Sequence, residues 1–233
     1  MLRLSGKAVY KGIAAGTAVI LRKNDEQVKR RKIDDADAEI RRFLQAGKES
    51  ALQLQVLYDK AVKEVGEAGA AVFKAHQMML KDEDYVNTVY SMIRTEQVNA
   101  EYAAAVAGDH FSGMFAVMDD EYMRARAADI KDISNRLVRN LQGVSDMDWG
   151  NMEPSVIIAD DLSPSETVQM DREKVLAFVT VHGSSNSHTA ILARMMNIPA
   201  LIGVPADLEK LRTGMTVIVD GYREEVIFEP AQE

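Results

Sequence analysis

The chain of 233 residues contains no cysteine. That absence excludes disulfide bonds, thiolate nucleophiles and metal sites built on sulfur, and it agrees with a reducing compartment. The sequence also lacks an uninterrupted apolar run of about 20 residues, the length of a membrane span. Residues 1–10 lack the apolar core of a signal peptide. We therefore expect a cytoplasmic protein that does not bind membranes.

Basic residues are also few. Lys and Arg number 28 against 36 Asp and Glu, which leaves a net charge of -8. Nucleic-acid binding depends on clustered Lys and Arg, so no nucleic-acid partner is expected. No phosphate-binding loop or dinucleotide fingerprint is present, which disfavours a nucleotide enzyme. With 47% hydrophobic and 27% charged residues, the composition is that of a globular protein.

Proline is absent from residues 33–143, and this region has helical periodicity. Apolar residues recur at three- and four-residue steps over 33–65, which predicts one long helix. Gly66 and Gly69 are expected to end it. Further helices are predicted at 70–80, 84–93, 100–117 and 119–141. Short connections between them favour an antiparallel bundle.

Both ends of the chain have a different texture, with short apolar runs of strand length. Residues 1–22 are β-rich, and further strands are predicted at 156–159, 176–181, 200–202 and 217–219. Helical pieces are predicted between them at 163–170, 187–197 and 206–211. The sequence thus predicts an α/β domain formed by 1–22 and 146–233, with the antiparallel helical bundle of residues 23–145 inserted into it.

His188 is the candidate nucleophile. It follows strand 176–181 and a Gly/Ser/Asn loop, and Ser187 is a suitable N-cap for the next helix. The positive helix start favours a neutral imidazole and a bound anion. A phosphoryl group there would meet backbone N–H groups and a polar loop consisting of Ser184, Ser185, Asn186, Ser187 and Thr189. From the residues alone, a histidine that only begins a helix is equally admissible.

A second loop precedes the helical piece that begins near Ser163. Ser163 as N-cap, Pro164 at the first helical position and Glu166 as capping-box partner account for those three residues structurally. Thr167 has no such explanation. It follows a strand expected to neighbour that of His188, so its hydroxyl is a candidate to orient the imidazole or to contact the phosphate.

Other chemistries are less well supported. No Gly-x-Ser-x-Gly elbow is present. His182 and His188 with Asp160 and Asp161 could bind a metal, but the six-residue spacing of the histidines across a loop matches no dedicated site, so no metal is expected in this chain. His76 suits a partner contact or bundle packing equally. The run Met78-Met79-Leu80 has acidic neighbours and suits a basic partner with an apolar centre, although a solvated helix end beside core methionines explains it as well.

Together these residues resemble a known family. The stretch Ser187-His188-Thr189-Ala190-Ile191-Leu192-Ala193-Arg194 is similar to the phosphohistidine signature of enzymes that use phosphoenolpyruvate. Within that group the chain resembles the N-terminal domain of the enzyme I family, the phosphoenolpyruvate–protein phosphotransferases of the bacterial sugar phosphotransferase system. Residues 12–16, 73–84, 119–130 and 162–167 extend the resemblance over almost all of residues 1–230, and the inserted bundle is its most specific part.

The resemblance implies a swivelling phosphohistidine domain whose His188 accepts phosphate on Nε2 and donates it to HPr, the histidine phosphocarrier. It implies that Thr167 hydrogen-bonds near His188. It also implies that the bundle docks HPr through a set of matching positions: Glu67, His76, Met78, Met79, Glu83, Asp84, Tyr85, Phe115, Met123 and Arg126. Hinges near residues 22–32 and 143–153 are expected on the same ground.

The sequence departs from the family at three places. The family usually has Gly-Gly-Arg-Thr-Ser-His where this chain has residues 183–188, so a possible phosphate contact of arginine is replaced by neutral donors. Ala68 and Gly69 stand where charged residues are frequent. Family members also continue into a C-terminal phosphoenolpyruvate-binding barrel, which brings dimerisation and Mg²⁺, so we expect this chain to have no cofactor and no use of phosphoenolpyruvate by itself.

The sequence therefore predicts a phosphotransferase domain that exchanges a phosphoryl group between His188 and HPr. Two alternatives stay open at this point. One is the phosphohistidine domain of a paralogous phosphorelay of the nitrogen or sugar-kinase type. The other is a non-catalytic module that binds an HPr-like protein, in which His188 is structural.

Overall fold

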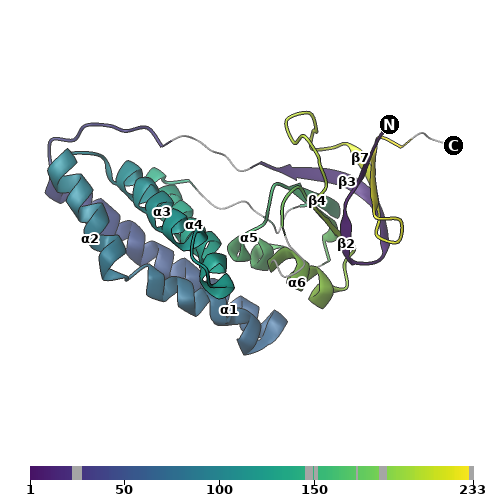
Figure 1. The fold of residues 1–233 in the computed structure, drawn as a ribbon, viewed down its shortest axis with the longest axis horizontal. Helices are drawn as coiled ribbons and strands as arrows, with labels where there is room; N and C mark the ends of the chain where they lie inside the picture. The colour runs from purple at the N-terminus through teal and green to yellow at the C-terminus, as the bar shows by residue number, and fades with distance from the viewer. Residues whose placement is uncertain (23–27, 145–148, 150–151, 172, 184–187, 231–233) are drawn as a thin grey trace. The chain divides into compact units, whose positions relative to one another are not determined.

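The computed structural model describes residues 1–22, 28–144, 149, 152–171, 173–183 and 188–230. The chain divides into two compact units. Met1–Asn24 and Asp148–Glu233 form an α/β unit, and Asp25–Met147 form a helical unit. Both chain ends therefore contribute to one unit, and the other is inserted between them (Figure 1).

The α/β unit is built on one mixed sheet, which has eight strands among the described residues, in the order β1-β8-β7-β3-β4-β5-β6-β2. The strands are β1 (Leu2–Ser5), β2 (Lys7–Tyr10), β3 (Ile13–Leu21), β4 (Ser155–Ala159), β5 (Val175–Thr180), β6 (Ala200–Ile202), β7 (Thr216–Asp220) and β8 (Glu225–Phe228). Strands β3, β4, β5 and β6 pair in parallel, and the outer pairs are antiparallel. The central strands therefore end at one common edge.

Two short helices connect the parallel strands. Helix α5 (Pro164–Gln169) joins β4 to β5, and α6 (His188–Met196) joins β5 to β6. Strand β4 is buried along its whole length, as expected for a central parallel strand. Its Val156 and Ile158 belong to a continuous core with Val179 of β5 and Phe228 of β8. The short apolar runs predicted as strands thus form the centre of the sheet.

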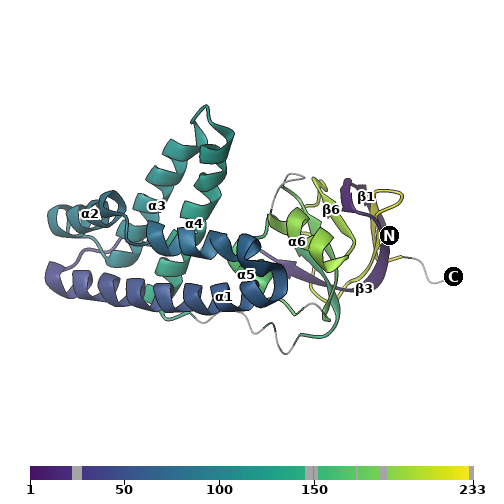
Figure 2. The same ribbon diagram turned by 90° about the horizontal axis from the view of Figure 1, so that it is seen from below.

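The helical unit begins with α1 (Ala36–Met79), which Asp35 caps by accepting a hydrogen bond from the Ala38 N–H. Gly66 interrupts the helix with φ 76° and ψ 173°, a backbone conformation open mainly to glycine. The second part of α1 then runs back beside the first, and the Gln77 side-chain amide donates to the Ala51 carbonyl oxygen (Figure 2). A single residue thus converts one amphipathic run into a helical hairpin.

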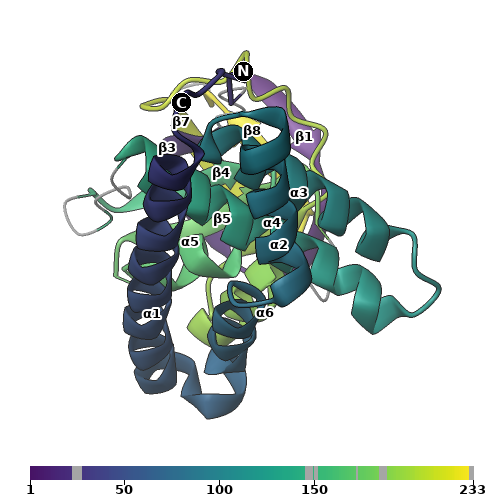
Figure 3. The same ribbon diagram turned by 90° about the vertical axis from the view of Figure 1, so that its left-hand side faces the viewer.

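The unit continues with α2 (Glu83–Ser91), a π-helical turn η1 (Met92–Glu96), α3 (Ala100–Ala116) and α4 (Glu121–Gln142). Helices α3 and α4 pack side by side (Figure 3). Small residues permit this contact: a Cβ added to Gly108 of α3 would lie 2.3 Å from the Ser134 Oγ of α4. Alanines at 103, 104 and 107 are fully buried in α3. The alanine-rich sequence therefore serves close helix packing.

Most predicted elements are confirmed, and the differences have physical causes. Gly66 interrupts α1 as predicted, but Gly69 lies inside the helix and the prediction of a break there is wrong. The helix predicted at 206–211 is also wrong, because these residues contain a turn at Asp207. The Asp207 side chain accepts from the Glu209 N–H, and its carbonyl oxygen accepts from the Lys210 N–H. Strand β8 was not predicted.

Candidate functional site

The candidate site lies at the edge where the parallel strands end. Strands β4 and β5 are direct neighbours, so the loop into α5 and the loop into α6 leave the sheet side by side. Helices α5 and α6 are in contact with each other. Ligands of α/β proteins bind at such carboxyl edges, where loops and helix starts converge. The predicted adjacency of the Thr167 and His188 strands is therefore confirmed.

Helix α5 begins as predicted. The Ser163 side chain accepts from the Glu166 N–H at 3.3 Å, and the Glu166 carboxylate accepts from the Ser163 N–H at 2.8 Å. Thr167 is 4% exposed, and its Oγ1 lies 3.1 and 3.0 Å from the carbonyl oxygens of Ser163 and Pro164. Its only hydroxyl hydrogen is thus donated within the helix, so Oγ1 retains lone pairs to accept a bond from a neighbour.

Helix α6 begins at His188. The His188 side chain and the loop residues Ser184, Ser185, Asn186 and Ser187 lie outside the described residues. Thr189 is described: it is fully buried, and its Oγ1 has no hydrogen-bond partner among the residues that the structure describes. Thr180, the last residue of β5, has the same two properties. The Thr189 hydroxyl is thus enclosed by the protein rather than exposed to solvent.

A second imidazole, that of His182, lies at this edge, and from the sequence it was considered only as a metal ligand. The His182 Nδ1 lies 2.9 Å from the Asp160 Oδ1, and the His182 backbone N–H donates to the Asp160 carbonyl at 2.8 Å. The signal was available, because both residues directly follow the ends of strands expected to be neighbours.

His76 packs inside the helical unit. Its side chain is fully buried, with Nε2 3.2 Å from the Asp129 Oδ1 and Nδ1 3.6 Å from the Asp132 Oδ2 of α4. The ring also meets Phe73 edge to face, with centroids 6.1 Å apart. Of the two interpretations left open by the sequence, the structure favours bundle packing. A partner would touch none of this side chain.

The other proposed docking positions differ in exposure. Glu67, Met78, Glu83 and Asp84 are exposed, and Met78 has 75% of its surface accessible. We call these four residues the acidic–methionine surface. Glu67 and Met78 are separated by about three helical turns and so lie on one face of α1. Asp82 caps α2 through the N–H groups of Asp84 and Tyr85, which places the Glu83 and Asp84 carboxylates at a helix start.

The remaining docking positions are partly or wholly enclosed. Met79, Phe115, Met123 and Arg126 are half-buried, and the Arg126 Nη1 lies 3.3 Å from the Asp129 Oδ2. Tyr85 is buried, and burial raises the pKa of its phenol to about 12 although a hydrogen bond with Ser134 acts in the opposite direction. Tyr85 and His76 can therefore support a docking surface only from beneath.

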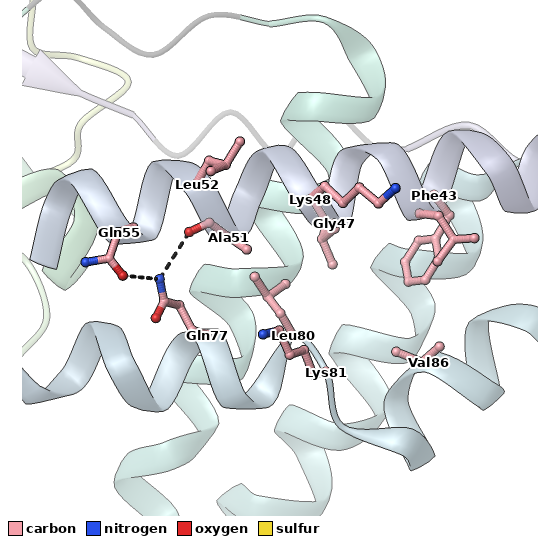
Figure 4. Close-up of a pocket in the computed structure, with 12 residues that line it drawn as sticks. Phe43, Gly47, Lys48, Ala51, Leu52, Gln55, Gln77, Leu80, Lys81 and Val86 are labelled. Carbon is pink, nitrogen blue, oxygen red and sulfur yellow. Dashed lines mark hydrogen bonds between the residues drawn. The ribbon is translucent and has the colours of Figure 1, made fainter.

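A groove of about 830 Å³ separates the two parts of α1 (Figure 4). Phe43, Leu80 and Leu137 form its buried floor, and Lys48 and Lys81 are exposed at its rim. At Gly47 an added Cβ would meet nothing within 4 Å. The groove is mainly apolar and lacks the groups that chemistry requires.

The described residues contain neither a candidate metal cluster nor a candidate membrane-spanning helix. Within those parts of the chain, no group of three or more His, Asp or Glu side chains is arranged to hold a metal ion. Among the helices described, none is long and apolar enough to cross a membrane.

Comparison with known proteins places the chain in a family. The model of the PEP-utilising enzyme, N-terminal family matches residues 5–126, and that of the PEP-utilising enzyme, mobile domain family matches residues 151–224. The chain belongs to the PEP-utilising enzymes.

Particular relatives are more informative. The phosphoenolpyruvate-protein phosphotransferase of Bacillus subtilis (strain 168) is 40% identical over 234 residues, which cover 100% of this chain and 41% of that protein. The protein of the same name from Haemophilus influenzae is 38% identical over 97% of this chain and 40% of its own length. This chain thus spans about two fifths of the length of these curated relatives.

Solved structures agree with this placement. An NMR solution structure of Enzyme I (nEIt) superimposes with a TM-score of 0.80 at 36% identity, covering 98% of this chain and 94% of the other. The N-terminal domain of Enzyme 1 - Nitrogen superimposes with a TM-score of 0.66 at 24% identity, covering 97% of this chain and 94% of the other. The second likeness concerns the fold alone.

Proposed function

We propose that this chain is the phosphoryl-transfer part of a phosphoenolpyruvate–protein phosphotransferase of the sugar phosphotransferase system. In this proposal His188 accepts a phosphoryl group and exchanges it with HPr in the cytoplasm. The observation that carries the proposal is the start of α6 at His188, at the carboxyl edge of the sheet and against α5. Similarity to phosphoenolpyruvate-protein phosphotransferases over the whole chain supports it.

The reaction needs a nucleophilic nitrogen with a free lone pair. His188 Nε2 attacks phosphorus, the phosphorus–nitrogen bond of the donor imidazole breaks, and its electron pair stays on the donor nitrogen. One proton passes from the His188 ring through water to the donor ring, so charge and atoms balance. Backbone N–H groups at the start of α6 stabilise the phosphoryl oxygens, because the first N–H groups of a helix have no partner within it.

Thr167 holds the acceptor ring in the required tautomer. Its hydroxyl hydrogen is donated within α5, so its oxygen accepts from a ring N–H. We assign that N–H to Nδ1 of His188, which leaves Nε2 as the nucleophile. Among the loop residues, Ser184, Ser185, Asn186 and Ser187 act as neutral donors to the phosphate. Thr189, which is fully buried, acts only as support.

HPr docks on the helical unit. The acidic–methionine surface offers three carboxylates around an exposed apolar side chain, which suits a basic partner with an apolar centre. Met79, Phe115, Met123 and Arg126 border or support this surface, and His76 and Tyr85 support it from the interior. Charge complementarity of this kind acts mainly on the association rate and depends on salt.

The relatives are longer than this chain, and we assign the use of phosphoenolpyruvate to the part they have in addition. In this proposal that part is a C-terminal barrel, which binds Mg²⁺ and loads His188. The chain described here needs no cofactor of its own for exchange with HPr.

The proposal is tested by incubating the chain with phospho-HPr and mapping the modification by mass spectrometry under alkaline conditions. We expect an acid-labile phosphoryl group on the wild type and on His110→Ala, which replaces an exposed histidine of the helical unit. His188→Ala should take none. A wild type that binds HPr without modification would reduce the chain to a binding module and overturn the proposal.

A further inference from the structure

The pair formed by His182 and Asp160 connects the two loops of the site. One bond joins backbone to backbone at 2.8 Å, and the other joins imidazole to carboxylate at 2.9 Å. The His182 side chain is nevertheless 71% exposed, and that of Asp160 is 38% exposed. The imidazole is therefore oriented by its neighbour while most of its surface stays accessible.

The carboxylate determines what the other ring nitrogen can do. Ionised Asp160 only accepts hydrogen bonds, so the bond requires a hydrogen on His182 Nδ1. Nε2 then carries a hydrogen only when the ring is an imidazolium. In that state Nε2–H is a charged donor, which binds anions more strongly than a neutral hydroxyl or amide does.

A phosphoryl group at this edge needs such a donor. It carries between one and two negative charges at neutral pH, yet the sequence from Gly183 to Ser187 contains no basic residue. Arg22 follows β3 at the same edge, but its guanidinium donates to the carbonyls of Leu208 and Leu211. In the stretch from Asp160 to Ser187 the sequence has Arg172 and Lys174 after α5, outside the segments that directly precede the two helices. His182 is the basic residue that the fold places within those loops.

We propose that His182, oriented by Asp160, donates a hydrogen bond from Nε2–H to the phosphoryl group carried by His188. This inference rests on the proposed function. The contact forms no covalent bond and transfers no proton. It stabilises the negative charge on the phosphoryl oxygens while the group passes between nitrogens. The carboxylates of Asp160, Asp161 and Glu166 and the ring of His188 are the other titratable groups of these two loops and helix starts.

The test compares two substitutions of His182 and one of His110 in single-turnover transfer from phospho-HPr. His182→Asn retains an N–H near the position of Nδ1 for Asp160 but removes Nε2. His182→Arg retains a positive donor. His110→Asn is the matched control at an exposed histidine of the helical unit. Unchanged circular dichroism and an unchanged Kd for HPr establish that each variant is folded and binds.

We expect His182→Asn to slow transfer about tenfold, the value of one charge-assisted hydrogen bond. His182→Arg should keep the wild-type rate, and His110→Asn should not change it.

Two results would overturn the inference. A His182→Asn rate equal to wild type removes the contact. Slow transfer by His182→Arg shows that the positive charge of the donor is irrelevant. A wild type that accepts no phosphoryl group is distinguishable from both, because it overturns the proposed function and this inference together.

Discussion

His76 of the helical unit and His182 of the α/β unit lie in opposite environments. His76 is fully buried beside two carboxylates, whereas Glu67, Met78, Glu83 and Asp84 of the same unit are exposed. In the α/β unit His182 is exposed at a sheet edge, next to the loop that leads to His188. In the proposed function this comparison separates recognition from chemistry: one unit would offer a charged and apolar surface, and the other would offer oriented donors and the nucleophile.

The cores of the two units also differ in the residues that fill them. Alanine and glycine bring α3 and α4 into close contact, whereas Val, Ile and Phe fill the core of the sheet. Each unit thus has an apolar core of its own. A change in one core is expected to affect that unit first, and a change at either surface is expected to affect binding or chemistry separately.

The largest expected effect is on stability. Phe73 is fully buried and packs against His76, so Phe73→Ala should cost the helical unit about 3–5 kcal/mol. Phe178→Ala in β5 should cost the α/β unit a similar amount. Hydrogen exchange read residue by residue should show each loss of protection within the substituted unit. Equal loss throughout the chain after either change would contradict separate cores.

The next effect is on the rate of phosphoryl transfer and leaves HPr binding unchanged. Thr167→Val keeps the shape of the side chain but removes the acceptor proposed for His188, so single-turnover transfer should slow about tenfold. The Kd for HPr should not change, and Thr167→Ser should keep most of the rate. A wild-type rate for Thr167→Val would remove Thr167 from the site.

The third effect is on HPr binding and leaves the rate of phosphoryl transfer unchanged. Glu83→Lys reverses a charge of the acidic–methionine surface, so HPr binding should weaken roughly fivefold at low salt and less at high salt. Transfer at saturating HPr should keep its rate. Glu49→Lys, an equal charge change on α1 rather than α2, is the control. Equal weakening by both substitutions would indicate a net-charge effect rather than a docking site.

The smallest effect compares two glycines of α1. At Gly47 the helix is regular and an added Cβ meets nothing, so Gly47→Ala should stabilise the helical unit by about 1 kcal/mol. At Gly66 φ is 76°, so Gly66→Ala should destabilise it by about 1 kcal/mol. Urea unfolding measures both. A stabilising Gly66→Ala would show that the hairpin of α1 does not need this conformation.

Sequence periodicity predicted the elements whose patterns are local. The long helix before Gly66 and the buried strands β4 and β5 follow from spacing and burial alone. Strand β8 is short, and its ladder depends on pairing with β7 and with β1, which comes from the opposite end of the chain. Gly69 was misjudged because glycine permits a break without requiring one, and its φ is not positive.

The candidate site was predictable in part. Neighbouring parallel strands bring the loops before α5 and α6 together, which the order of strands and helices already suggested. The depth of a side chain was not predictable: His76, Tyr85 and Thr189 are buried although each carries a polar group. The His182–Asp160 pair depends on strand register, which places Ala159 beside Thr180. Register is set by the whole sheet rather than by a motif.

The separation of recognition from chemistry is tested most directly by one pair of titrations with HPr. Isothermal calorimetry of wild type and His188→Ala, with phosphoryl acceptance from phospho-HPr measured on the same samples, reads both properties at once. We predict Kd values equal within about twofold and no acceptance by His188→Ala. Loss of HPr binding together with acceptance would contradict the account, and so would full acceptance by His188→Ala.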